Sequence, residues 1–264
     1  MGTTIHDLAA FKARGEKFPM LTAYDVQTAR LLDEAGIPVL LIGDSLGQVL
    51  LGYDHTVPVT VEEMLHHCRA VVRGATNALL VGDMPFGTYG AVLDDGLRNA
   101  VRFMKEGGVH AVKVEGPQAE LVERLSAIGV PVMGHLGLTP QSVHLFGGYR
   151  VQGRNEETAT RILRYAKELE EAGAFALVLE CVPGELGSAV TRALSIPTIG
   201  IGAGPDTDGQ VLVVNDMAGL STGKLPKFVK RYADVAGVIS DAAKAFADEV
   251  RGGTYPGPEH SYDG

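Results

Sequence analysis

The stretch Leu40-Leu41-Ile42-Gly43-Asp44-Ser45-Leu46-Gly47 is a short apolar run that ends in a carboxylate, a hydroxyl and glycines. An apolar run of this length is typical of a strand that is buried on both faces, as in a parallel sheet. The same arrangement recurs along the chain, because later apolar runs also end in an ionisable side chain: Asp83, Glu115, His135 and Glu180. The carboxyl ends of parallel strands meet at one face, so the pattern predicts one site built from these strand ends.

Around this stretch, short apolar runs alternate with segments of helical periodicity over most of the chain. The runs that we interpret as strands are 18–23, 39–43, 79–82, 110–114, 130–135, 175–179, 197–201 and 211–214. Eight alternating units without a clear linker predict an α/β fold, a single (β/α)8 TIM barrel over residues 1–264. A short helix at 4–12 precedes the barrel, and a polar tail follows from about residue 252. Between the strands we expect a loop at 47–60 and helices that include 94–105 and 117–127, and a long final helix at 232–250. An open, doubly wound sheet is the alternative, because the eighth run is short.

Composition and charge narrow the class of protein. The chain has 264 residues with 45% hydrophobic composition, and a formal net charge of −9 argues against nucleic acid as its main partner. The two cysteines, Cys68 and Cys181, give no disulfide framework and suit a reducing compartment. Residues 1–14 lack the features of a signal peptide, and no apolar run approaches the roughly 20 residues of a membrane span. We therefore expect a cytoplasmic protein with no membrane partner.

The acids at three strand ends predict a metal site. Asp44, Asp83 and Glu115 would lie together at the active face of a barrel, and their mutual repulsion would favour protonation unless a cation joins them. Oxygen ligands suit Mg²⁺ or Mn²⁺ better than zinc. The alternative for each acid taken alone is a helix cap or a turn residue, which loops after strands often require.

Three further side chains belong to the same face. Glu180 lies across the barrel from Asp44 in strand order, and a carboxylate away from the metal can act as a general base; a salt bridge at the rim is the alternative. Lys113 lies two residues before Glu115 on one strand, so the two side chains face the same way. A lysine inside the barrel should pair with a carboxylate of the protein or the substrate. His135 has no zinc-ligand cluster around it, so we expect a hydrogen-bonding role.

Other conspicuous residues receive structural interpretations. His66 and His67 are adjacent on a helix and do not face one side together, so we assign both to the surface. Cys181 follows Glu180 and is expected to be buried filler. The glycines of 200–204 lack the spacing of a dinucleotide-binding loop, and close approach of the backbone to a ligand is the preferred interpretation. The irregular segment 136–154 is long enough to predict a functional loop.

The order and the residues of several motifs resemble those of one known family. They are Thr22-Ala23-Tyr24-Asp25, Gly43-Asp44-Ser45-Leu46-Gly47, Asp83-Met84-Pro85-Phe86, Val112-Lys113-Val114-Glu115-Gly116, Gly134-His135-Leu136-Gly137-Leu138-Thr139-Pro140-Gln141-Ser142, Phe146-Gly147-Gly148-Tyr149, Leu179-Glu180-Cys181-Val182-Pro183 and Ile199-Gly200-Ile201-Gly202-Ala203-Gly204. Together they resemble the ketopantoate hydroxymethyltransferase family. They span the chain from Leu21 to Pro226 in family order, and the set is far more specific than any one of its members.

The resemblance implies an activity and its reactants. The family transfers a hydroxymethyl group from 5,10-methylenetetrahydrofolate to 3-methyl-2-oxobutanoate and gives 2-dehydropantoate, the first step of the pantoate branch of pantothenate and coenzyme A biosynthesis. It uses one Mg²⁺ per subunit, and it assembles as a homodecamer. These are expectations that the resemblance carries, and composition and periodicity did not supply them.

The resemblance also implies roles for residues of this chain. Asp44, Asp83 and Glu115 correspond to the metal site, and Glu180 corresponds to the catalytic base. The side chains that correspond to substrate binding are Asp44, Ser45, Asp83 and Lys113, to which we add His135. The nearest competing function is a Mg²⁺-dependent 2-oxo-acid C–C lyase or aldolase on the same barrel, which would turn over without folate. A non-catalytic metabolite-binding protein is a further alternative, and it would tolerate Glu180→Gln.

Overall fold

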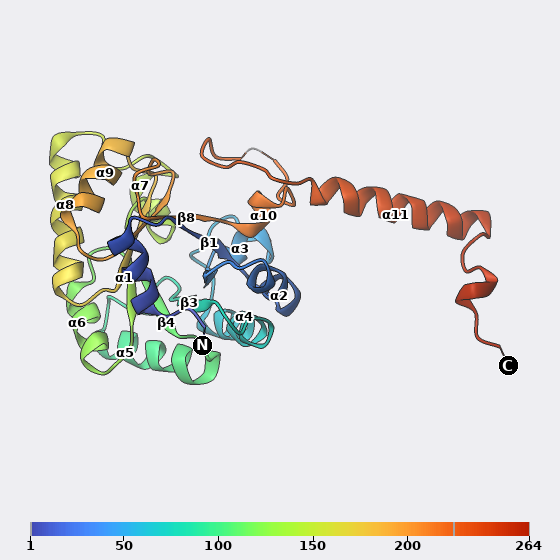
Figure 1. Cartoon of the computed structure of the whole chain (residues 1–264), viewed down its shortest axis with the longest axis horizontal. Helices are drawn as coiled ribbons and strands as arrows, with labels where there is room; N and C mark the ends of the chain where they lie inside the picture. The colour runs from blue at the N-terminus through green and yellow to red at the C-terminus, as the bar shows by residue number, and fades with distance from the viewer. Residues whose placement is uncertain (1, 224, 264) are drawn as a thin grey trace. The chain divides into compact units, whose positions relative to one another are not determined.

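The computed structural model describes residues 2–223 and 225–263, and it divides into two compact units, one ending at Val213 and the other beginning at Val214. The first unit contains eight strands that form a closed parallel barrel in chain order (Figure 1). The strands are β1 Phe18–Thr22, β2 Val39–Ile42, β3 Leu79–Asp83, β4 Ala111–Glu115, β5 Val132–Gly137, β6 Ala176–Glu180, β7 Thr198–Ile201 and β8 Gly209–Leu212.

Barrel closure decides between the two predicted architectures. β1 pairs with β2 on one side and with β8 on the other, where Phe18 is in register with Gly209. An open sheet would leave β1 and β8 as edges, so the doubly wound alternative is wrong and the predicted (β/α)8 barrel is confirmed.

Helices follow the strands and lie around the outside of the barrel in Figure 1. They are α2 Val26–Glu34, α3 Leu46–Val49, α4 Val61–Gly74, α5 Leu93–Arg102, the π-helical turn η1 Phe103–Gly107, α6 Ala119–Ala127, the 3₁₀ turn η2 Pro140–Ser142, α7 Val143–Phe146, α8 Glu156–Glu171 and α9 Gly184–Ala193. All of them lie in the segments that connect one strand to the next, as the alternation of a (β/α)8 barrel requires.

The amino-terminal end of the barrel is filled by the leading helix α1, Ile5–Arg14. Leu8 is fully buried in the hydrophobic cluster that contains the first residues of several strands, and Ile5 and Phe11 pack against the same cluster. The first strand residues in the cluster are Phe18, Val39, Leu79, Ala111 and Ala176. This core closes the amino-terminal end of the barrel. The carboxyl ends of the strands and their polar side chains lie at the opposite end.

Register places the ionisable residues of neighbouring strands beside one another. Asp83 is in register with Lys113, and Glu115 is in register with His135. On the next pair, Gly137 is in register with Glu180. Between neighbouring strands, the polar groups at the carboxyl ends of β3, β4, β5 and β6 therefore lie in register or two residues apart.

Several predicted boundaries differ from the structure. The predicted helix 117–127 begins only at Ala119, after Gln118, so Pro117 lies outside its first turn. The predicted helix 94–105 is split into α5 and η1, and the loops at 47–60 and 136–154 contain the short helices α3, η2 and α7. Single turns carry too few residues to produce a measurable period in a sequence, which explains why they were missed.

A buried acid outside the site fixes the loop before β3. The carboxylate of Asp33 on α2 accepts hydrogen bonds from the backbone NH groups of Thr76, Asn77 and Ala78 at 3.1, 3.0 and 2.7 Å. Burial raises the pKa of Asp33, but these hydrogen bonds outweigh it and hold the pKa below its usual value. The acid therefore stabilises the loop as a carboxylate.

The second unit contains α10 Val214–Met217, α11 Val235–Gly252 and the 3₁₀ turn η3 Pro258–His260. Asp234 caps α11 by accepting a hydrogen bond from the NH of Gly237, so the helix begins three residues later than the predicted start at Tyr232. Phe246 and Tyr255 meet edge to face with ring centroids 5.3 Å apart. That residues 1–264 act as one domain stays a prediction. Across both described ranges, we find no helix with the length and apolar character needed to span a membrane.

Candidate active site

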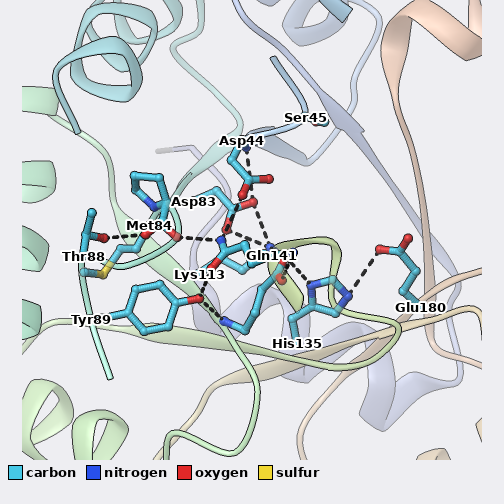
Figure 2. A network of polar contacts seen from close by, with 12 residues as sticks. Asp44, Ser45, Asp83, Met84, Thr88, Tyr89, Lys113, His135, Gln141 and Glu180 are labelled. Carbon is cyan, nitrogen blue, oxygen red and sulfur yellow. Dashed lines mark hydrogen bonds and ion pairs between the residues drawn. The ribbon is translucent and has the colours of Figure 1, made fainter. Parts of the chain in front are cut away.

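Three carboxylates converge at the carboxyl end of the barrel. Asp83 and Glu115 are the last residues of β3 and β4, and Asp44 lies two residues beyond the end of β2. One oxygen of each carboxylate lies within 4.8 Å of one oxygen of the other two, and all three side chains are buried. Figure 2 shows Asp44 and Asp83 side by side in this network.

Lys113 is the nearest cation to these acids. Its Nζ donates to both oxygens of Asp83, at 2.7 and 2.8 Å, and lies 3.5 Å from Glu115 Oε1. Burial lowers the pKa of Lys113, but the Coulomb attraction of Asp83, Glu115 and Asp44 outweighs it and raises the pKa above its usual value. Lys113 is therefore an ammonium ion paired with carboxylate, and its charged form argues against a nucleophilic role.

One lysine does not balance three buried acids. Burial and then the charges of Asp83 and Glu115 raise the pKa of Asp44 well above its usual value. Burial would likewise raise the pKa of Glu115, but Lys113 and His135 hold it below its usual value. Asp44 is thus the acid with the least compensation. An all-oxygen donor set with excess negative charge fits a hard divalent cation, and the three carboxylates form a site suited to one.

His135 lies between the acid cluster and the remaining carboxylate. Its Nδ1 is 3.3 Å from Glu115 Oε1 and its Nε2 is 3.3 Å from Glu180 Oε2, although neither approach has the geometry of a hydrogen bond (Figure 2). Burial and Lys113 lower the pKa of His135, but the two glutamates raise it to about 9. The imidazole therefore connects the two sets of carboxylates as a cation.

Glu180 ends β6 and is more open than the three acids, because its side chain is 16% exposed whereas that of Glu115 is 4% exposed. Its backbone is tightly held. The carbonyl of Glu180 accepts the NH of Leu138 at 2.8 Å, and the NH of the following Cys181 donates to Ile201 O at 2.9 Å. The glutamate thus sits at the mouth on a fixed segment.

Cys181 has a strained backbone. It is the non-glycine residue with a positive φ, 46°, within the described ranges, and it directly follows Glu180. Burial, followed by the charge of Glu180, raises the pKa of its thiol to about 12. The thiol is therefore protonated at neutral pH. It is only partly buried, so the prediction of a buried filler is wrong in its degree of burial.

Ser45 lies at the edge of the same network, where it precedes α3. Its Oγ is 2.9 Å from the phenolic oxygen of Tyr24, which follows β1. The structure therefore brings every residue assigned to the site from the sequence to one face of the barrel: Asp44, Ser45, Asp83, Lys113, Glu115, His135 and Glu180.

Two residues of this network were not predicted. Gln141 donates to Asp44 and Glu115, and Tyr89 donates to Gln141 (Figure 2). Gln141 lies within the segment 136–154, whose length predicted a functional loop. The sequence therefore indicated the loop, but it did not single out Gln141. Tyr89 lies in the loop after β3, where an aromatic residue has no distinguishing pattern.

One more of the structural interpretations needs correction. His67 is half-buried, and its Nδ1 lies 2.6 Å from the carbonyl oxygen of Tyr24, so only His66 has the exposed position predicted for both. A Cβ on Gly200 would lie 2.6 Å from Thr207 Oγ1, and one on Gly204 would lie 2.8 Å from the Cα of Gly184, so both glycines closely approach other parts of the protein. Close approach of this backbone to a ligand stays a prediction.

Comparison with known proteins gives a consistent result over nearly the whole chain. A family model described as ketopantoate hydroxymethyltransferase matches residues 2–258. A relative from Thermobifida fusca (strain YX), named 3-methyl-2-oxobutanoate hydroxymethyltransferase, is 59% identical over 261 residues, which cover 98% of this chain and 93% of the relative. A relative with the same name from Syntrophotalea carbinolica (strain DSM 2380 / NBRC 103641 / GraBd1) is 53% identical and covers 98% of both chains.

Solved structures show similarity in fold at low sequence identity. A phosphonopyruvate hydrolase in complex with oxalate and Mg²⁺ aligns with a TM-score of 0.62 and 14% identity, covering 98% of this chain and 93% of that one. A 2,3-dimethylmalate lyase of the PEP mutase/isocitrate lyase superfamily aligns with a TM-score of 0.60 and 15% identity, with coverage of 98% and 93%. At this identity the likeness concerns the barrel and its connections alone.

Proposed function

This chain belongs to the ketopantoate hydroxymethyltransferase family, and from that premise we propose that it transfers a hydroxymethyl group from 5,10-methylenetetrahydrofolate to 3-methyl-2-oxobutanoate. The product is 2-dehydropantoate, in the first step of the pantoate branch of pantothenate and coenzyme A biosynthesis. The observation that carries the proposal is the convergence of three buried carboxylates, a charged lysine and a separate glutamate at one end of the barrel.

In this proposal, Asp44, Asp83 and Glu115 hold one Mg²⁺. Their oxygens are close enough to share one ion, and Asp44 lacks the compensating charge that Lys113 gives to Asp83. Bound there, Mg²⁺ would supply Lewis acidity that stabilises negative charge on the oxygens of a 2-oxo acid.

The substrate carboxylate is assigned to the lysine side of the site. Lys113 provides a fixed ammonium group, and Ser45 provides a hydroxyl that Tyr24 holds in place. Asp44 and Asp83 border the same space, and His135 offers a cationic NH between this region and Glu180. These groups orient the 2-oxo acid so that its C3 carbon faces the glutamate.

Glu180 is the proposed general base. It removes the proton from C3 of 3-methyl-2-oxobutanoate, and the electron pair of that C–H bond forms the new bond to the one-carbon unit of the folate. This attack breaks the bond from the one-carbon unit to one folate nitrogen, and water then displaces the other nitrogen. The water oxygen becomes the hydroxyl group of the product, and the C3 proton and one proton of the water go to the two nitrogens as tetrahydrofolate leaves. His135 Nε2 lies 3.3 Å from Glu180 Oε2, beside the base.

A homodecamer in the cytoplasm completes the proposal. It rests on the family resemblance and on the absence of a segment suited to spanning a membrane in the described ranges. Sedimentation velocity of the purified protein tests the assembly.

Deuterium exchange at C3 of 3-methyl-2-oxobutanoate in D₂O, followed by NMR, tests the chemistry directly. We expect exchange that requires Mg²⁺, stops with EDTA and falls by about 10²–10⁴-fold in Glu180→Gln. Glu185→Gln is the matched control, because Glu185 is an exposed acid in the first turn of α9. Addition of 5,10-methylenetetrahydrofolate should then convert the substrate to 2-dehydropantoate.

The same measurement separates the competing functions. A 2-oxo-acid lyase or aldolase would show turnover of its own substrate without folate. A metabolite-binding protein would bind the 2-oxo acid without exchange. Exchange that persists unchanged in Glu180→Gln would contradict the assignment of the base and leave the metal site standing.

A further inference from the structure

One residue contacts all three chain segments that carry the carboxylates, two of them through its side chain and the third through its backbone NH. It is Gln141 of η2, which lies in the loop after β5 and is almost completely buried. We propose that Gln141 is a positioning residue that sets the spacing of the three metal-site carboxylates, and that Tyr89 holds Gln141 in place. This inference rests on the proposed metal site and extends it beyond its three ligands.

The contacts of Gln141 reach each carboxylate segment separately. Its Nε2 donates to Asp44 Oδ2 at 2.9 Å, and its backbone NH donates to Glu115 Oε2 at 3.1 Å. The same Nε2 donates to the carbonyl of Met84 at 2.9 Å, which fixes the residue directly after Asp83. A single amide and its own backbone therefore connect the ends of β2, β3 and β4 (Figure 2).

The orientation of the Gln141 amide follows from its partners. A carboxylate and a backbone carbonyl are acceptors only, so the amide nitrogen must face Asp44 and Met84. The amide oxygen then faces Tyr89, whose hydroxyl donates to it at 2.6 Å. All hydrogen-bonding groups of the side chain are in use, as a buried polar group requires.

Tyr89 connects the amide back to the acid cluster. Its hydroxyl accepts the backbone NH of Glu115 at 2.9 Å while it donates to Gln141. Its loop is fixed by a turn in which the Thr88 hydroxyl donates to Pro85 O at 2.6 Å, and Asn99 of α5 donates to Thr88 O at 2.9 Å. Hydrogen bonds thus connect α5 to the loop of Tyr89, and Tyr89 connects that loop to Gln141 and to the backbone of Glu115.

Such support is needed because the acids repel one another in a buried site. Without fixed donors, Asp44 and Glu115 would separate when no cation is bound, and binding would then require them to be brought together again. Donors held in place keep the carboxylates close beforehand. Partners of this kind beyond the metal ligands typically contribute 10–100-fold to metal affinity.

The test is a titration of the purified full-length protein with Mn²⁺, in which the EPR signal of free Mn²⁺ gives the dissociation constant of Mn²⁺. Competition by Mg²⁺ then gives the dissociation constant of Mg²⁺. We expect Gln141→Met to raise the Mn²⁺ dissociation constant by about 10–100-fold. Tyr89→Phe, which removes one oxygen atom, should raise it by a smaller factor of about 3–10. The double variant should bind as weakly as Gln141→Met, because Tyr89 acts through Gln141.

Gln210→Met is the matched control, because Gln210 on β8 also donates two hydrogen bonds through its amide, to Gly204 O and Thr207 Oγ1, and contacts no carboxylate in the described ranges. It should bind Mn²⁺ like the unmodified chain. Melting temperatures are measured in parallel, since a purely structural role would lower the melting temperature of Gln141→Met and leave its Mn²⁺ affinity unchanged. That outcome overturns the inference.

Two further results have a defined meaning. If Gln141→Met does not fold, Tyr89→Phe decides, and affinity within about twofold of the unmodified chain overturns the inference. If the unmodified chain itself fails to bind Mn²⁺, the proposed metal site fails and the inference fails with it, whereas normal binding by the unmodified chain and by Gln141→Met rejects the inference alone.

Discussion

Lys113 Nζ donates to both carboxylate oxygens of Asp83, at 2.7 and 2.8 Å, across the register pair that joins β3 to β4. The pair is fully enclosed, so the lysine compensates a charge that water cannot reach. It also lies 3.5 Å from Glu115, which makes it the main internal counter-charge of the acid cluster. In the absence of metal, this ion pair limits the repulsion within the site.

Replacement of Lys113 by methionine keeps an unbranched side chain that is one atom shorter, and removes its charge. We expect the metal-free variant to lose about 3–5 kcal/mol in free energy of unfolding, because a buried carboxylate is left without its partner. Added Mg²⁺ should raise the melting temperature of the variant more than that of the unmodified chain, since the cation then replaces the missing charge. Lys105→Met, at an exposed lysine, is the control, and equal Mg²⁺ increments in all three proteins would contradict this account.

His135→Gln tests the cationic imidazole between Glu115 and Glu180. The pKa of His135 is raised to about 9 in the folded protein, against 6.5 for an unperturbed histidine. Its contribution is therefore fully present below about pH 6.5 and is lost as the pH rises through about 9. With EDTA present, urea unfolding should show a difference between the two proteins of about 3 kcal/mol at pH 6.5, which shrinks toward pH 9.5. A difference that does not change with pH would rule out the charged imidazole.

Gly137→Ala tests the contact between the end of β5 and the proposed base. Gly137 has φ of +93°, and an added Cβ would lie 2.2 Å from the carbonyl oxygen of Glu180. The alanine must displace the backbone of Glu180, so we expect turnover to fall by about 100-fold or more, as a shift of about 1 Å at a catalytic group does.

Gly129→Ala is a control matched in backbone conformation. Gly129 has φ of +86°, but a Cβ at this position would meet nothing within 4 Å. Both variants carry the strain of alanine at positive φ, and only Gly137→Ala pushes against Glu180. Similar turnover in the two variants would show that strain alone, and not displacement of the base, causes the loss.

Asp33→Asn tests the acid that fixes the loop before β3. An asparagine cannot accept all of the NH groups of Thr76, Asn77 and Ala78, so we expect a loss of about 2–4 kcal/mol in free energy of unfolding at pH 7. Because the pKa of Asp33 is lowered on folding, its contribution is present above about pH 4 and is lost as the pH falls further.

Urea unfolding between pH 3 and pH 6 provides the measurement for Asp33→Asn. The difference between the unmodified chain and the variant should be constant from pH 6 to about pH 4 and should decrease below that value. The exposed neighbour Glu34→Gln should show little difference at any pH. A difference that grows as the pH falls would contradict the carboxylate form of Asp33.

The barrel and its catalytic face could be predicted because the signal is repeated. Each strand is a short apolar run, and Asp44, Asp83, Glu115 and Glu180 follow such runs at nearly the same offset. Parallel strands in a closed barrel then force these residues together, so the distances in the site follow from topology. Lys113 was placed correctly for the same reason, since its position relative to Glu115 is fixed by the alternation along one strand.

The hydrogen bonds that Gln141 and Tyr89 make around the acids could not be predicted in the same way. Gln141 and Tyr89 lie in loops, where no period relates sequence position to direction, and their partners are 97 and 52 residues away in the chain. The π-helical turn η1 and the start of α6 at Ala119 are local features of a few residues, which also leave no period. What repeats in the chain was predictable, and what depends on a single tertiary contact was not.

The acids, the lysine, the histidine and the base all come from the consecutive strands β2 to β6, and they occupy one continuous stretch of the chain from Asp44 to Glu180. The side chains proposed for the reaction therefore lie in one continuous part of the sequence, whereas the loops that follow β7 and β8 carry none of them. A substitution in either of those loops would therefore leave every one of these side chains in place. The mouth of the barrel has one side that carries the reacting groups and another side that can be altered without removing any of them.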